Sequence, residues 1–119
     1  MRSGHVVRPR SLVLSSALLA TLTACGFPKT GPVPGAVSPA EVTAATAKWP
    51  NATEAQLTSG RDAFVARCNH CHGYPDVGSV PEGEWPAIID RMGNKASLDA
   101  SQKDAVLRFI LVARSTPGA

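Results

Sequence analysis

Residues 68–72 read C-N-H-C-H and hold most of the side chains in this chain that could do chemistry. The 119-residue chain contains three cysteines and three histidines, and two of each fall within these five positions. Thiols and imidazoles at this spacing can form a redox dithiol, a structural disulfide, part of a zinc site or an attachment point for a haem. The surrounding sequence has to discriminate among these four kinds of site.

The spacing of Cys68, Cys71 and His72 matches the c-type haem attachment motif C-x-x-C-H. Two cysteines three positions apart at the end of a helix can reach the two vinyl groups of one porphyrin and form thioethers. The next residue, His72, then lies beneath the iron as its proximal ligand. We therefore predict one covalent haem c, with His70 as a spacer inside the attachment loop.

The other three kinds of site are less well supported. A thioredoxin-like dithiol follows a strand and begins a helix, whereas Cys68 follows a predicted helix in a chain without a βαβ pattern. A structural zinc ion requires four ligands, and this segment supplies three with no second pair elsewhere. A disulfide between Cys68 and Cys71 would close a short loop and stabilise the fold little.

A haem that only transfers electrons takes a second axial ligand, and Met92 is the candidate. Beyond residue 24 the chain has no other methionine, and its only histidines are His70 and His72. His70 lies inside the attachment loop and cannot reach the opposite face of the ring. We predict that Met92 is the distal ligand; the alternative is an ordinary core residue, as methionines at helical spacing often are.

Two helices must position these ligands. The first is predicted to begin at Thr58 or Ser59, which can cap it, and to end at Cys68. The second is predicted over residues 84–93, with a proline in its first turn and a glycine just past its end. Its apolar residues recur at helical spacing and share one face: Trp85, Ile88, Ile89 and Met92.

A third helix is predicted after Asp99, which forms a capping-box pattern with Gln102. Its apolar stripe consists of Val106, Phe109, Ile110 and Ala113. The predicted fold class is all-α, with three helices in roughly 60 residues. A domain with few large side chains buries too little apolar surface to offset the conformational entropy lost on folding. We therefore expect the helices to wrap around the covalent haem.

Three stretches together resemble the small monohaem cytochromes c of bacterial envelopes: G-R-D-A-F-V-A-R-C-N-H-C-H-G at 60–73, E-W-P-A-I-I-D-R-M at 84–92 and V-L-R-F-I at 106–110. The resemblance covers residues 57 to about 113. It implies thioethers at Cys68 and Cys71 and axial ligation by His72 and Met92.

The resemblance also implies packing between the first and last helices of the domain. Gly60 and Phe64 should contact Phe109 where these helices cross. A proline carbonyl should hold the proximal histidine, and Pro75 and Pro81 are both candidates. The separation of His72 and Met92 is short for this family, so the haem edge should be comparatively exposed.

The implied function is one-electron transfer. A haem with histidine and methionine ligands has no open coordination position, so we expect an electron carrier for redox protein partners and not an enzyme. The alternative is a haem-based sensor or gas-binding module in which Met92 is labile or absent from the iron. We expect the protein to be monomeric.

The N-terminus has the pattern of an export signal. Arg2, Arg8 and Arg10 precede an apolar run over residues 12–24, which is too short to cross a hydrocarbon core that needs roughly 20 residues. The run ends in L-T-A-C, which resembles the bacterial lipobox. This resemblance predicts a signal peptide over 1–24 and a lipid on Cys25. An ordinary secretory signal that leaves Cys25 as a stray thiol is the alternative.

The remaining sequence completes the predicted organisation. Residues 25–56 are rich in proline, alanine and threonine and are predicted to be a flexible linker with a reach of roughly 30 Å, followed by the cytochrome c domain over 57–119. From Cys25 onward nine Lys and Arg balance nine Asp and Glu, so no nucleic acid is expected. The predicted location is the cell envelope, lipid-anchored to a membrane and facing the periplasm or the exterior.

Overall fold

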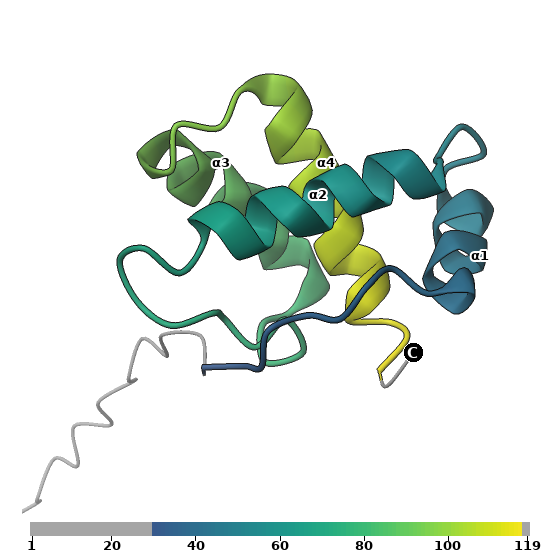
Figure 1. Cartoon of the computed structure of the whole chain (residues 1–119), viewed down its shortest axis with the longest axis horizontal. Coiled ribbons are helices and arrows are strands. Elements are labelled where there is room, and N and C mark those ends of the chain that lie inside the picture. Colours follow the sequence, from purple (N-terminus) through teal and green to yellow (C-terminus); the bar gives the residue numbers. More distant parts are fainter. Residues whose placement is uncertain (1–29, 118–119) are drawn as a thin grey trace, which may run out of the picture.

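The computed structural model describes residues 30–117, which form a compact bundle of helices (Figure 1). The elements are α1 (Pro39–Lys48), α2 (Glu54–Arg67), the 3-10 helix η1 (Glu82–Glu84), α3 (Trp85–Lys95) and α4 (Ala100–Ala113). Within this part of the chain there is no strand, only an isolated bridge between Thr30 and Pro75. The all-α prediction is confirmed, but the described residues contain four α-helices where three are predicted.

Helix α1 corrects the prediction of a flexible linker over residues 25–56. Ser38 caps it: the Ser38 hydroxyl accepts a hydrogen bond from the Glu41 backbone N–H, and the Glu41 carboxylate accepts one from the Ser38 N–H. Pro39 lies in the first turn, where its missing N–H costs nothing. Ala45 is fully buried in a small cluster with residues from three other segments, namely Ala52, Leu57 and Val112. Residues 39–48 therefore belong to the folded body.

Helix α2 begins four residues before the predicted start. Its N-cap is Thr53, whose hydroxyl accepts a hydrogen bond from the Gln56 N–H at 3.1 Å. Thr58 and Ser59, the predicted caps, are exposed residues in the second turn of the helix. The earlier start adds Leu57 to the buried face of α2, so this helix joins the small cluster around α1 to the main core.

The starts of α3 and α4 are as predicted, but the end of α3 is not. α3 has Pro86 in its first turn and continues through Gly93 to Lys95. Gly93 is buried within the helix, where an added Cβ would lie 2.8 Å from Lys103 Cγ, and the left-handed residue beyond the helix is Ser97. α4 begins with the predicted capping box of Asp99 and Gln102.

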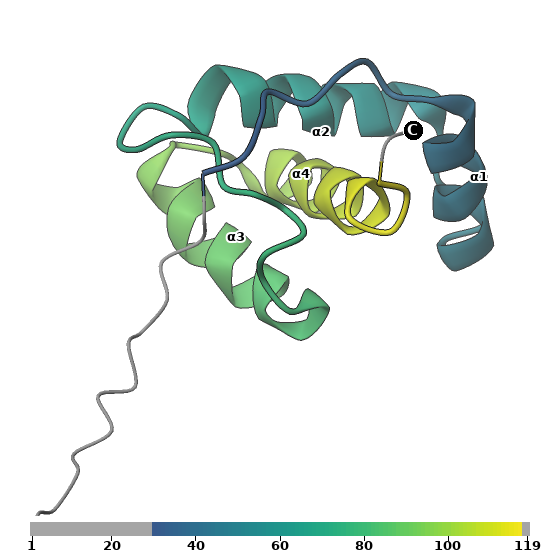
Figure 2. The same cartoon turned by 90° about the horizontal axis from the view of Figure 1, so that it is seen from below.

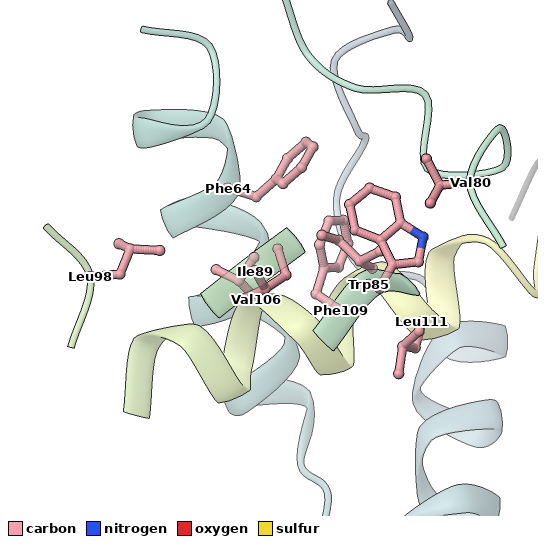
Figure 3. Close-up of a cluster of buried hydrophobic side chains, with 9 residues drawn as sticks. Phe64, Val80, Trp85, Ile89, Leu98, Val106, Phe109 and Leu111 are labelled. Atoms are coloured by element: carbon pink, nitrogen blue, oxygen red, sulfur yellow. The ribbon is translucent and has the colours of Figure 1, made fainter. Parts of the chain in front are cut away.

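Helices α2 and α4 cross at close range, and the main core lies beside this crossing (Figures 1 and 2). A Cβ at Gly60 would lie 2.1 Å from the Ala105 carbonyl oxygen, so only glycine allows this approach. One turn later the rings of Phe64 and Phe109 pack with their centroids 6.1 Å apart. The cluster, with Trp85 at its centre (Figure 3), comprises Phe64, Val80, Trp85, Ile89, Leu98, Val106, Phe109, Ile110 and Leu111.

Residues 30–37, called here the N-terminal strap, run beside α2 from the loop after that helix back to α1 (Figures 1 and 2). The strap starts against the segment that follows the C-N-H-C-H loop, where the Gly31 N–H donates to the Tyr74 carbonyl at 2.7 Å. Midway, the Arg61 guanidinium donates to the carbonyls of Pro34 and Gly35 at 2.9 and 3.0 Å. The strap is therefore also part of the folded body.

Candidate functional site

The C-N-H-C-H loop follows the last turn of α2, as predicted. Cys68 is the C-cap of the helix, and its backbone N–H donates to the Phe64 carbonyl at 2.9 Å. Its side chain is half-buried and packs against the main core, whereas Cys71 is exposed. The two thiols are not bonded to each other. The loop therefore presents one thiol at the edge of the core and the second on the surface.

Burial raises the pKa of the Cys68 thiol to about 11. The thiol is therefore protonated at neutral pH, and its position at the C-terminal end of a helix also disfavours a negative charge. Redox-active dithiols depend on a cysteine whose pKa is lowered, commonly at the N-terminal end of a helix. The environment of Cys68 has the opposite effect and argues against the redox dithiol.

His72 is exposed, and one of its ring nitrogens is already engaged. Nδ1 lies 2.8 Å from the backbone carbonyl of Gly73. Because a carbonyl can only accept, this contact places the proton on Nδ1 and leaves the lone pair on Nε2 available to a metal. Metal-bound histidines typically donate their second N–H to such a partner. The partner here is Gly73 and not the predicted Pro75 or Pro81. His70 is exposed as well.

The peptide that orients His72 is itself fixed from two sides. The Tyr74 hydroxyl donates to the Val65 carbonyl at 2.8 Å, and its ring stacks on Phe64 with centroids 5.8 Å apart. From the other side, the Tyr74 carbonyl accepts the hydrogen bond from Gly31 in the strap. The Gly73 carbonyl is thus held between α2 and the strap, which limits how the His72 ring can turn.

Met92 lies in α3 at the same end of the molecule as the loop. The Arg67 guanidinium donates to the carbonyl of Ala96 at 3.2 Å, so the C-terminal ends of α2 and α3 meet beside Cys68. Met92 comes one turn before Ala96. Its predicted neighbours on the apolar face differ from it: Trp85 and Ile89 are buried and Ile88 packs on the core. Met92 is partly buried but does not pack on the core cluster.

The indole of Trp85 carries an unsatisfied donor. The residue is completely buried, and its Nε1–H has no hydrogen-bond partner among the described residues. A buried N–H left without an acceptor costs about 1–3 kcal/mol. No residue between 30 and 117 supplies the missing acceptor.

These residues together fit the predicted haem. The unbonded thiols of Cys68 and Cys71 and the free Nε2 of His72 follow α2. The sulfur of Met92 lies outside the core on α3, whose C-terminal end meets that of α2. Between residues 30 and 117, no group of three or more His, Cys, Asp or Glu side chains is placed to hold a metal ion. A shallow hollow beside the start of α2, lined by Thr53, Glu54 and Asp62 among others, contains none of the predicted ligands.

The predicted signal peptide over 1–24 and the predicted lipid on Cys25 lie outside the described residues. No helix in the described part of the chain is long and apolar enough to cross a membrane. Comparison of the chain with family models, curated proteins and solved structures gives no match.

Two features of this site are missed by reasoning from the sequence. One is the strap, although Gly31 and Gly73 mark the places where it approaches the loop closely. The other is the unsatisfied Trp85 donor, for which the sequence contains no signal, because burial and hydrogen bonding depend on the whole fold.

Proposed function

We propose that this protein is a tethered electron carrier with one haem c attached through Cys68 and Cys71 and ligated by His72 and Met92. The observation that carries the proposal is the C-N-H-C-H segment, in which the Gly73 carbonyl holds His72 Nδ1 and leaves Nε2 available. When bound there, the haem supplies one-electron cycling between Fe(III) and Fe(II).

The cysteines have the task of attachment. Each thiol would add across one vinyl group, with sulfur bonding to one carbon and the hydrogen passing to the other, so no oxidant or reductant is consumed. The step requires unbonded thiols, which is the state of Cys68 and Cys71 in the fold. Two thioethers would also replace part of the stabilisation that a body of this size lacks.

Met92 would determine the reduction potential of the iron and the access of other ligands to it. A thioether ligand stabilises reduced iron and raises the reduction potential, and it fills the coordination position that a gas molecule would need. The position of Met92 outside the core cluster supports this role, because its sulfur is not packed among the buried side chains.

The position of Met92 outside the core cluster also favours the second candidate, a gas-binding sensor, because a ligand that is not locked by packing dissociates more readily. The two functions separate in the spectrum of the reduced protein with and without carbon monoxide. We expect the wild type to ignore carbon monoxide and Met92→Ala to bind it. Ile88→Ala, a truncation of a half-buried neighbour in the same helix, should remain insensitive. Ready binding by the wild type would favour the sensor and refute the simple carrier.

A further inference from the structure

The strap enters the folded body directly beside the proposed haem ligand. Thr30 forms the bridge with Pro75, and a Cβ at Gly73 would lie 2.7 Å from Thr30 Cγ2. A Cβ at Gly31 would lie equally close, 2.7 Å, to the Cα of Asp76. These close contacts, together with the bridge, fix the point where the strap enters the body, next to His72.

The strap is then fastened along its length and cannot serve as a tether. Arg61 binds the carbonyls of Pro34 and Gly35, and Ser38 caps α1, which packs on α4 and α2 through Ala45. Of the predicted linker, only residues 25–29 precede the described body, and five residue steps join Cys25 to Thr30. Five residue steps span at most about 18 Å in any conformation, since an extended chain advances 3.3–3.6 Å per residue.

Helix α2 shows how this length compares with the body. Its 14 residues extend for about 21 Å, and the C-N-H-C-H loop follows one end while α1 lies at the other (Figures 1 and 2). The tether is thus shorter than the helix. A lipid on Cys25 would keep the loop end near the bilayer, whereas the α1 end could remain near it only if the body lay on its side.

We propose that residues 66–76 and the adjoining end of α3 face the lipid headgroups, with α1 pointing away from the membrane. This inference rests on the tether of the proposed function, taken as the predicted lipid on Cys25. The domain is then held with Thr30, which lies beside the haem-bearing end, within about 18 Å of the lipidated residue. The electron-transfer partner would then expose its own redox group at the level of the headgroups of the same membrane.

The experiment uses the full chain, expressed in a bacterial envelope, purified from membranes and placed in nanodiscs that contain a small fraction of lipids carrying a gadolinium chelate. The measured quantity is the paramagnetic relaxation enhancement of backbone amides in the reduced protein. Ala55 and Ala66 form a matched pair because both are exposed residues of α2. They are eleven residues apart, so they lie on the same side of the helix and about 16 Å apart along it.

We expect the enhancement to be several-fold larger at Ala66 than at Ala55. Ten Gly and Ser residues inserted between Pro28 and Lys29 should abolish most of this difference, whereas the same insert after Ala119 should leave it unchanged. Equal enhancements in the wild type, or a larger one at Ala55, would overturn the orientation but not the anchor. A protein recovered without lipid would overturn the anchor and this inference together, and leave the haem assignment standing.

Discussion

Gly60→Ala tests the crossing of α2 and α4, on which the position of the C-N-H-C-H loop depends. The added Cβ would lie 2.1 Å from the Ala105 carbonyl oxygen, and ordinary contact begins near 3.4 Å, so the helices must separate by about 1.3 Å. Overpacking of this kind costs about 1–3 kcal/mol. The separation also loosens the pair of Phe64 and Phe109, which contributes about 0.5–1.5 kcal/mol.

The better helix propensity of alanine offsets about 1 kcal/mol of this cost. The net loss in the free energy of unfolding is therefore about 0.5–3.5 kcal/mol. Its central value of about 2 kcal/mol corresponds to about 8–16 °C in the midpoint of thermal unfolding for a body of this size. Chemical and thermal denaturation followed by circular dichroism would measure both quantities on the same preparation.

Two other glycines provide matched controls for this substitution. A Cβ at Gly83 would meet nothing within 4 Å, so Gly83→Ala should change the stability by less than about 0.5 kcal/mol. A Cβ at Gly93 would meet the flexible side chain of Lys103, which can move aside, so Gly93→Ala should be near neutral. If Gly60→Ala were as stable as these two variants, the helix crossing described above would be wrong.

Three further predictions concern the site. In the haem-free protein, burial raises the pKa of Cys68 to about 11, so its alkylation at pH 8 should be about 100-fold slower than that of a thiol of pKa 9.0. Peptide mass mapping would measure the rate, and a rate midpoint near pH 9 would contradict the prediction. Tyr74→Phe removes the bond to the Val65 carbonyl and should cost about 0.5–1.5 kcal/mol of stability in denaturant titrations, and an unchanged midpoint would refute that bond. His72→Ala should abolish the normal absorption spectrum of the reduced haem, whereas His70→Ala should preserve it; equal effects would refute the assignment of the ligand.

The sequence predicts the parts of this fold that local signals specify. Helix α4 is an example, since the capping box of Asp99 and Gln102 and the stripe of Val106, Phe109 and Ile110 agree about where it lies. The loop after α2 is equally local, because the spacing of its cysteines and histidine is independent of what surrounds them. Both therefore appear in the structure where the sequence places them.

Helix α1 is missed because its local signals conflict. Several prolines precede it and favour a spacer, but Pro39 is the first helical residue, where proline is favoured. The helix buries only Glu41 and Ala45, so it has almost no apolar period to detect. The capping-box pattern of Ser38 and Glu41 is the signal that could have revealed it.

The partners of the site residues depend on contacts between distant segments and could not be predicted. The Gly73 carbonyl beside His72 is held in place through Tyr74, which bonds to α2 and to Gly31, 43 residues earlier in the chain. The position of Met92 outside the core likewise depends on how α3 is rotated about its own axis where it packs against α4. A motif predicts which residues are ligands, whereas the tertiary fold decides what holds them in place.

Covalent attachment of haem is the central claim, and acid–acetone extraction of protein expressed in a bacterial envelope tests it most directly. We predict that the precipitated protein stays red and gives a c-type pyridine haemochrome, and that this signal is lost when Cys68 and Cys71 are both replaced by serine. A colourless precipitate from the unaltered chain, with the pigment in the acetone or with no pigment at all, would contradict the account.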